Sequence, residues 1–253
     1  MKNEKIVFLM IGNSRLHWGF LNKNNLRETW DTEHLATNIN KNFIKKYFPN
    51  TLELNQFIQG NIPFFIASVV PSQLQFFQDF SNVNIIKLDD IPIKNIYPTM
   101  GIDRALALWG AIKKYGYPCL VIDGGTALTL TGVNNKKELV GGAILPGLKL
   151  QQKALAIHTA ALPHISLSHS LPSRWAMNTN EAIESGITYT ILAGITDFIE
   201  DWYEQYSNSY ILLTGGDRNY LFTNLINYKP SFQDKLIEDK NLIFWGMKHL
   251  SKN

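Results

Sequence analysis

The chain has 253 residues, of which 45% are hydrophobic and 18% are charged. This length fits one large domain or two halves of about 100–150 residues each, and the apolar content excludes a disordered chain. The formal net charge is +3 and the sequence pI is 8.8. Lys and Arg nevertheless form no basic run, so we expect no nucleic-acid partner.

The cysteine content and the length of the apolar runs indicate the cellular compartment of the protein. A single cysteine, Cys119, excludes an intrachain disulfide and a thiolate zinc cluster. It lies in an apolar run over 119–122, where a buried, unreactive thiol is expected. The first apolar run is too short for a signal peptide, and no run has the length of a membrane span. We therefore expect a cytoplasmic protein with no membrane partner.

The first half of the chain alternates segments of strand length with segments of helical spacing. In chain order we expect strands over 6–11 and 14–20, a helix over 34–48, a strand over 64–70, a helix from 71, a strand over 84–88 and a helix over 103–115. Two prolines set boundaries here, because Pro49 cannot continue a helix and Pro71 can open one. Gly116 ends the last helix.

The second half begins at Cys119. In chain order we expect strands over 119–122, 127–133 and 138–145, a helix from 146 to about 160, a long helix from 178 and a strand over 210–213. Asn178 and Glu181 resemble a capping box at the start of the long helix. This helix carries one apolar stripe, formed by Ile183, Ile187, Ile191, Ile195, Phe198 and Trp202.

One pattern occurs in both halves: an apolar strand, a small turn with glycine and a second strand. It begins at residue 6 and again at residue 119. Two such units facing one cleft are the architecture of actin-like (ribonuclease H-like) ATPases. We therefore predict a duplicated α/β fold of this kind, with two halves, 1–117 and 118–253, around a nucleotide cleft. The first phosphate turn and the substrate loop fall in the first half, and the second phosphate turn and an adenosine motif in the second.

The two turns have the composition of a phosphate-binding site. Gly12-Asn13-Ser14 and Gly124-Gly125-Thr126 each place glycine and a hydroxyl after a buried strand. Backbone N–H groups in such turns can hold phosphates, although an ordinary hairpin turn is the alternative for either sequence. Asp123 at the second strand end could hold a cation or cap local N–H groups. Thr214-Gly215-Gly216 suits a flat ligand such as adenosine, or a plain strand-to-helix turn.

Asp103 and Arg104 are adjacent where a loop becomes a helix. Arg104 can pair with a substrate carboxylate, and Asp103 can take the proton from an attacking hydroxyl. Alternatively, Asp103 is simply the N-cap of the helix. The P-loop spacing over 142–147 does not indicate a Walker motif, because Leu148 stands where lysine is required.

Eight short stretches follow one another between residue 6 and about residue 217. They are Ile11-Gly12-Asn13-Ser14, Ser68-Val69-Val70-Pro71, Gly101-Ile102-Asp103-Arg104, Asp123-Gly124-Gly125-Thr126-Ala127, Gly141-Gly142-Ala143-Ile144 with Pro146-Gly147, Leu162-Pro163, Asn178-Thr179-Asn180-Glu181-Ala182 with Ser185-Gly186, and Thr214-Gly215-Gly216. Together, in this order, they resemble the type III pantothenate kinase family.

The resemblance implies ATP-dependent phosphorylation of pantothenate to 4′-phosphopantothenate, the first step of coenzyme A biosynthesis. It also implies Mg²⁺ with ATP, a monovalent cation (K⁺ or NH₄⁺), and a homodimer with the substrate site at the interface. By position, Asp103 corresponds to the family's general base, Asp123 to its monovalent-cation ligand and Thr179 to a substrate contact from the partner chain. Pantothenate binding is assigned to Gly101, Ile102, Asp103, Arg104 and Thr179. ATP binding is assigned to Met10, Ile11, Gly12, Asn13, Ser14, Arg15, Leu16, His17 and Thr126.

The chain departs from the family pattern at three positions. The first motif of the family normally begins with Asp, where this chain has Met10, and a thioether does not bind a hard cation. A further family Asp corresponds to Thr131. The segment before the substrate loop differs in spacing by one residue, so Tyr97 receives no role. Of the properties that the resemblance implies, metal binding is the one that these departures affect most.

Two other functions stay open on the residues alone. One is a kinase for another small hydroxylated carboxylate, since Arg104 favours an acidic substrate. The other is a catalytically weakened homologue that binds ATP or a metabolite and has a regulatory role, for which Met10 is the main indication. The sequence contains Asp103, Asp123 and Thr179 in addition to Arg104, and this favours the kinase over the regulatory homologue.

Overall fold

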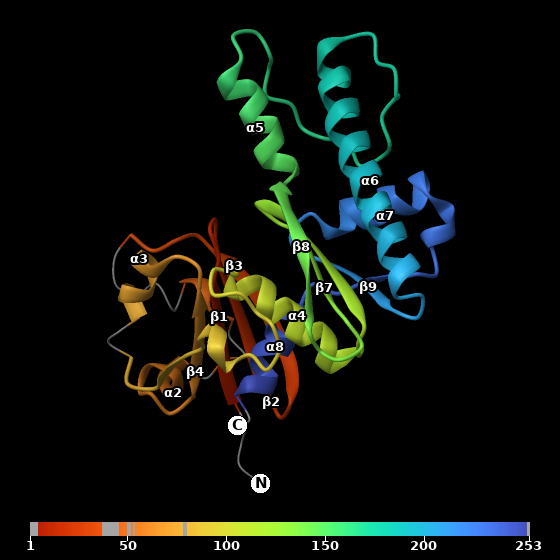
Figure 1. Ribbon diagram of the computed structural model, residues 1–253. Coiled ribbons are helices and arrows are strands. Elements are labelled where there is room, and N and C mark those ends of the chain that lie inside the picture. Colours follow the sequence, from red (N-terminus) through yellow and green to blue (C-terminus); the bar gives the residue numbers. More distant parts are fainter. Residues whose placement is uncertain (1–4, 37–45, 50–51, 53, 78–79, 252–253) are drawn as a thin grey trace. The chain divides into compact units, whose positions relative to one another are not determined.

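The computed structural model describes residues 5–36, 46–49, 52, 54–77 and 80–251. The chain forms two compact units, the first made of Met1–Pro92, Tyr97–Gly110 and Ile243–Asn253, the second of Ile93–Ile96 and Ala111–Leu242 (Figure 1). The boundary therefore falls within helix α4 (Ile102–Lys114). The last helix, α8 (Leu242–Leu250), lies almost wholly in the first unit. The predicted division at 117/118 had assigned it to the second half.

The first unit is built on a five-stranded sheet in the order β3-β2-β1-β4-β5. Its strands are β1 (Lys5–Ile11), β2 (Leu16–Asn22), β3 (Asn25–Thr32), β4 (Phe64–Ser68) and β5 (Val83–Ile85). The central strand β1 runs antiparallel to β2 and parallel to β4. Val7, Leu9 and Ile11 share one face of β1 and pack in a core with Trp18 and Phe64, as the period of two in a strand requires.

Helices cover this sheet. They are α2 (Leu54–Ile58), α3 (Pro71–Leu74), α4 and α8. A methyl group on Gly246 of α8 would overlap the carbonyl oxygen of Leu106 in α4, and one on Gly19 of β2 would come 2.9 Å from the ring of Phe244. This close packing explains why α8 belongs to the first unit. The helix predicted over 34–48 falls mostly outside the described residues.

The second unit contains a sheet in the order β10-β9-β6-β7-β8. Its strands are β6 (Cys119–Gly124), β7 (Ala127–Val133), β8 (Leu139–Pro146), β9 (Tyr210–Thr214) and β10 (Leu236–Glu238). The central strand β6 is antiparallel to β7 and parallel to β9. The first strand of each unit thus starts an antiparallel hairpin on one side and pairs in parallel on the other. The duplicated α/β architecture predicted from the two hairpins is confirmed.

The second unit also contains the helices α5 (Leu148–His158) and α6 (Thr179–Gln205), between β8 and β9, and α7 (Arg218–Tyr228), between β9 and β10. The predicted cap of α6 is confirmed, because the side-chain oxygen of Asn178 accepts a hydrogen bond of 3.0 Å from the backbone N–H of Glu181. The predicted apolar stripe is wrong at Phe198, which is 43% exposed. Ile199 is buried instead, since it lies four residues after Ile195 on the same face.

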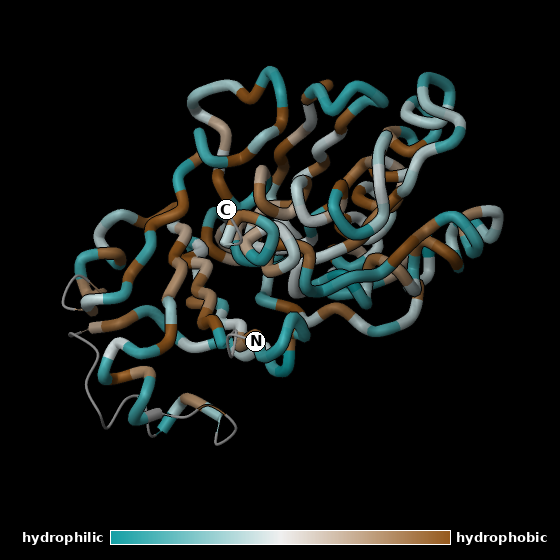
Figure 2. Tube along the Cα trace, turned by 90° about the horizontal axis from the view of Figure 1, so that it is seen from below, coloured by the Kyte–Doolittle hydropathy of each residue, from teal (hydrophilic) through white to brown (hydrophobic). Residues whose placement is uncertain are grey.

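The burial predicted for the single cysteine is confirmed. Cys119 is buried, and burial raises the pKa of its thiol to about 12, so the thiolate does not form near neutral pH. Hydrophobic and hydrophilic residues alternate along much of the trace (Figure 2). In the part of the chain that the structure describes, no helix combines the length and apolar character that crossing a membrane requires.

Candidate active site

The first predicted phosphate turn joins β1 to β2. The N–H of Gly12 donates to the carbonyl oxygen of Arg15 over 3.0 Å, which closes the hairpin. A ring nitrogen of His34, Nε2, lies 2.8 Å from the carbonyl oxygen of Gly12 and donates to it. Because the C=O and N–H of a trans peptide point in opposite directions, His34 directs the N–H of Asn13 to the other side of the turn. An amide held in this way can bind an anion.

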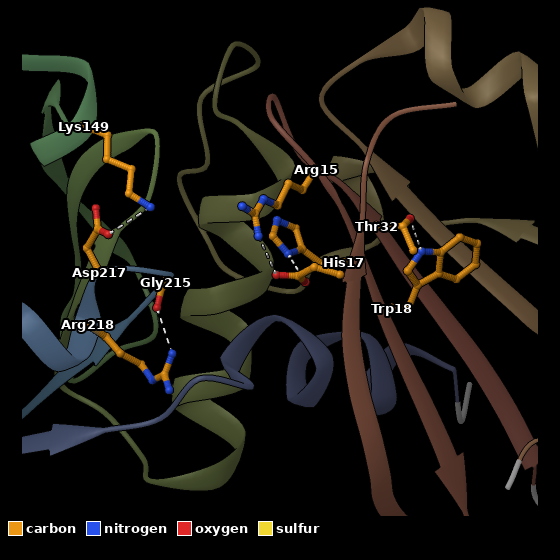
Figure 3. A network of polar contacts seen from close by, with 9 residues as sticks. Arg15, His17, Trp18, Thr32, Lys149, Gly215, Asp217 and Arg218 are labelled. Carbon is orange, nitrogen blue, oxygen red and sulfur yellow. Dashed lines mark hydrogen bonds and ion pairs between the residues drawn. The ribbon is translucent and has the colours of Figure 1, made fainter. Parts of the chain in front are cut away.

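Besides His34, the side chains of Arg15, His17 and Asp31 border this turn. His17 Nδ1 lies 2.8 Å from Asp31 Oδ1, and Arg15 Nη1 lies 3.9 Å from Asp31 Oδ2. The dashed lines from Arg15 and His17 in Figure 3 mark these contacts. Asp31 belongs to β3, a strand that the sequence did not predict, so only the structure brings this carboxylate to the turn.

The residues of the predicted ATP segment over 10–17 differ in their exposure. Met10, Ile11 and Leu16 are buried, whereas Asn13, Ser14 and Arg15 are exposed and Gly12 and His17 are half-buried. Met10 is only 1% exposed. It therefore packs as a core side chain at the end of β1, and the first turn has an apolar residue there instead of a carboxylate.

The second predicted phosphate turn joins β6 to β7. The N–H of Gly125 donates to the carbonyl oxygen of Ala127 over 3.1 Å, and the N–H of Gly147 donates to that of Thr126 over 2.9 Å. A methyl group on Gly147 would overlap the carbonyl oxygen of Gly125. Close packing of the segment before α5 thus fixes the shape of the turn and requires glycine at 147.

Asp123 lies between the second turn and the end of β9. Gly215 has a φ of +88°, and a methyl group on it would overlap Asp123 Oδ1 and come 2.5 Å from the carbonyl oxygen of Gly124. The N–H of Asp217 donates to the same carbonyl over 2.8 Å. The structure therefore brings together three motifs that are far apart in sequence: Asp123, the second turn and Thr214-Gly215-Gly216.

Charged residues that the sequence did not single out hold the Thr214-Gly215-Gly216 segment. Arg218 Nη1 donates to the carbonyl oxygen of Gly215 over 3.2 Å, and Arg218 Nε lies 2.9 Å from Glu238 Oε1. Lys149 Nζ lies 4.0 Å from Asp217 Oδ1 (Figure 3). Burial raises the pKa of Asp217, and the charge of Lys149 opposes this rise.

The substrate loop leads into α4. This helix begins at Ile102, so Asp103 lies in the first turn and its interpretation as the N-cap is wrong. Asp103 Oδ1 accepts a hydrogen bond of 2.8 Å from the N–H of Arg104. A methyl group on Gly101 would overlap the same oxygen. Glycine at 101 therefore leaves room for the Asp103 carboxylate to turn back toward the loop.

Arg104 is held before any ligand arrives. It is 7% exposed, and its Nη1 donates to the hydroxyl oxygen of Tyr97 over 2.8 Å. Tyr97 is thus a functional candidate that spacing along the sequence missed. Thr179, in contrast, is the first residue of α6 in the second unit and is exposed, whereas Asp103 and Arg104 belong to the first unit.

The donor set near the second turn limits how a metal could be bound. Among the described residues, no group of three or more His, Cys, Asp and Glu side chains could hold an ion by itself. Mg²⁺ is commonly held by one or two carboxylates together with substrate phosphates and water. Asp123 supplies one carboxylate beside the second predicted phosphate turn, so a cation bound there would need most of its ligands from the nucleotide and from water.

Two sheets of the same topology, each starting with a hairpin turn of glycine and hydroxyl residues, define an actin-like ATPase fold. A Baf family protein from Campylobacter jejuni has this fold at 24% identity and a TM-score of 0.62, with 98% of each chain covered. Component A of the (R)-2-hydroxyglutaryl-CoA dehydratase from Acidaminococcus fermentans has it at 10% identity and a TM-score of 0.53, with 96% of this chain and 94% of that one covered.

Sequence comparison narrows the class to one family. The family model described as type III pantothenate kinase matches residues 6–201. A type III pantothenate kinase from Nostoc sp. is 46% identical, over 95% of this chain and 92% of that protein. One from Synechocystis sp. is 42% identical, over 97% of this chain and 90% of that protein. The chain belongs to the type III pantothenate kinase family.

Proposed function

We propose that this chain transfers a phosphoryl group from ATP to the primary hydroxyl of pantothenate, giving 4′-phosphopantothenate for coenzyme A biosynthesis in the cytoplasm. The observation that carries the proposal is the family match over residues 6–201. The local geometry of the predicted motifs supports it, because each has the hydrogen-bonding groups that its assigned role needs.

In this proposal Asp103 is the general base. It accepts the proton of the attacking hydroxyl, and the N–H of Arg104, 2.8 Å from Oδ1, fixes the carboxylate so that its other oxygen can face the substrate. Arg104 binds the carboxylate of pantothenate. Its hydrogen bond to Tyr97 orients the guanidinium in advance, which lowers the entropic cost of substrate binding.

The two glycine turns bind the phosphates of ATP in the same proposal. The backbone amides of the first turn and Thr126 of the second are the donors. Mg²⁺ bound with ATP would neutralise phosphate charge, and a monovalent cation would be held by Asp123. The segment Thr214-Gly215-Gly216, fixed by Arg218, would receive the adenosine.

A homodimer completes the proposal, with Thr179 contacting pantothenate in the partner's site. Helix α6 has an exposed strip of small residues, Gly186, Thr190 and Gly194. A methyl group on either glycine would meet nothing within 4 Å. Met177, just before the helix, is 97% exposed. Uncovered apolar and small side chains of this kind support a protein interface. We expect a dimeric mass by light scattering and a monomeric mass for Met177→Glu; a monomeric parent chain would contradict the dimer.

The function is tested by incubating the purified chain with ATP, Mg²⁺, K⁺ and pantothenate and following the product by mass. Asp103→Asn keeps the side-chain oxygen that accepts from Arg104, so the fold should persist while turnover falls about 100- to 10,000-fold. Asp234→Asn makes the same change at an exposed site and should leave turnover intact. Turnover above about a tenth of the parent value in Asp103→Asn would exclude Asp103 as the base. ATP binding without any product would favour the regulatory alternative.

A further inference from the structure

We propose that Asp239 is a positioning residue, which anchors the helix that carries Asp103 to the strand that leads into Thr214-Gly215-Gly216. The inference deepens the proposed function, on which it rests for the role of Asp103 as the base and of the glycine segment as the adenosine site. It predicts that the contacts of Asp239 affect the rate of phosphoryl transfer more than the binding of either substrate.

Asp239 is a buried carboxylate outside the predicted motifs. It follows β10 and is 7% exposed. Its Oδ2 accepts hydrogen bonds from Lys114 Nζ over 2.6 Å and from the hydroxyl of Tyr115 over 2.9 Å. Its Oδ1 accepts one from the N–H of Asn241 over 2.8 Å. All four residues belong to the second unit, so the cluster lies within one compact body.

The side chain of Asp239 holds one end of α4. Lys114 is the last residue of this helix, and Asp103 lies in its first turn. A helix of 13 residues is about 20 Å long and is held by backbone hydrogen bonds along its whole length. A shift of its last turn is therefore transmitted to its first turn, where the proposed base lies.

The backbone at Asp239 holds the strand that leads into Thr214-Gly215-Gly216. The N–H of Asp239 donates over 2.9 Å to the carbonyl oxygen of Leu213, the residue before this segment. The preceding residue, Glu238, contacts Arg218, which donates to a carbonyl oxygen of the segment (Figure 3). One residue thus binds the end of α4 with its side chain and the end of β9 with its backbone.

The cluster also lies close to two places where the chain passes from one unit to the other. Helix α4 crosses after Gly110, and the chain crosses again after Leu242. Lys114 follows the first crossing by four residues, and Asp239 precedes the second by three. The bond between them therefore ties together two connecting segments on the side of the second unit, so neither can shift independently of the other.

Fold stability alone explains this cluster less well. Replacing a buried ion pair by apolar side chains of similar size is often neutral or stabilising, so such a pair is weak evidence for a role in stability. Charge-assisted hydrogen bonds, in contrast, fix the distance and direction of a contact. Phosphoryl transfer depends largely on positioning and electrostatics, and a displacement of about 1 Å can lower the rate about 100-fold. A contact that fixes geometry is therefore useful to this reaction.

The experiment measures steady-state kinetics with ATP and pantothenate, at a temperature where circular dichroism shows each variant to be folded. Lys114→Met removes the charged partner of Asp239 and should lower kcat about 10- to 100-fold, while the KM of each substrate changes less than about 3-fold. Asp239→Asn should cause a similar loss, and the double variant should lose no more than the larger single loss, because both remove one contact. Lys114→Arg can still donate to the carboxylate and should keep at least about a third of kcat.

Lys229→Met is the matched control. Lys229 pairs with Glu200, and its side chain is 42% exposed, against 39% for Lys114. The control pair lies between α6 and the end of α7, in the same unit. Its removal tests the loss of a lysine ion pair by itself and should leave kcat unchanged.

Hydrogen exchange provides a readout that needs no turnover. Mg·ATP should slow amide exchange in peptides that cover residues 102–114 of the parent chain. The reason is that the bound nucleotide orders the segment to which Asp239 is attached, and Asp239 passes this order to α4. The protection should be lost in Lys114→Met and kept in Lys229→Met.

Several results would overturn the inference. A kcat in Lys114→Met equal to that of the parent or of Lys229→Met removes the positioning role, and a rise in KM as large as the fall in kcat indicates a binding defect instead. A parent chain in which Mg·ATP leaves exchange in α4 unchanged also contradicts it. A parent chain that forms no product, but shows protection that Lys114→Met loses, contradicts the proposed function alone.

Discussion

Replacing Met10 with Asp restores the residue that the family normally has at the first motif, yet we expect it to destabilise this chain. Met10 is 1% exposed at the end of β1, beside the fully buried Ala67 on β4. The change removes a buried apolar side chain, which costs about 1.5–3 kcal/mol. It also buries a carboxyl group whose opposite neighbour, His17, already binds Asp31. Together these effects predict a loss of about 3–5 kcal/mol at pH 7.

For a chain of this size, about 3–5 kcal/mol corresponds to a fall in melting temperature of about 6–20 °C. Burial would raise the pKa of the new carboxyl above its unfolded value of about 3.9, so the deficit should grow as pH rises above that value and shrink in acid. Met10→Leu is the control, with an expected cost below about 1.5 kcal/mol. The assay pairs thermal melts with magnesium titrations of turnover. An unchanged melting temperature with a lower magnesium requirement would show that position 10 faces the nucleotide, contrary to its burial.

Three other changes test separate parts of the site. Arg104→Lys keeps the charge but loses the planar guanidinium, so steady-state kinetics should show the KM for pantothenate rising far more than the KM for ATP; equal rises would indicate a structural role. Gly215→Ala should lower the melting temperature by several degrees, because its methyl group would overlap Asp123 and the backbone φ is +88°. Gly216→Ala is the control: its methyl group would meet nothing within 4 Å, so its melting temperature should be close to that of the parent. Asp217→Asn should gain stability relative to the parent as pH rises above the unfolded pKa of Asp, about 3.9, because burial raises the pKa of Asp217 and ionisation of the parent costs stability. A difference that does not vary with pH in denaturant unfolding would contradict this.

Local signals in the sequence determined much of the fold. The two apolar strands with glycine turns became the β1–β2 and β6–β7 hairpins, and Asn178 became the cap of α6. Such features depend on neighbouring residues, through the period of burial, the capping of N–H groups and the conformational freedom of glycine, so they can be read along the chain. Short strands, and strands without a regular pattern of burial, could not be predicted in this way. Strand β3 has no regular alternation of buried and exposed residues, and β10 has three residues.

The ordered motifs were sufficient to predict the family and the candidate residues of the active site. Only tertiary structure decided their neighbours: Asp31 beside His17, Tyr97 on Arg104, and Gly215 against Asp123. It also decided that Met10 is buried and that Asp103 lies inside the helix rather than at its cap. The physical reason is that such contacts depend on strand register and on the close approach of segments distant in sequence. The residues next to a position in the sequence do not determine which distant segment of backbone will pack against it.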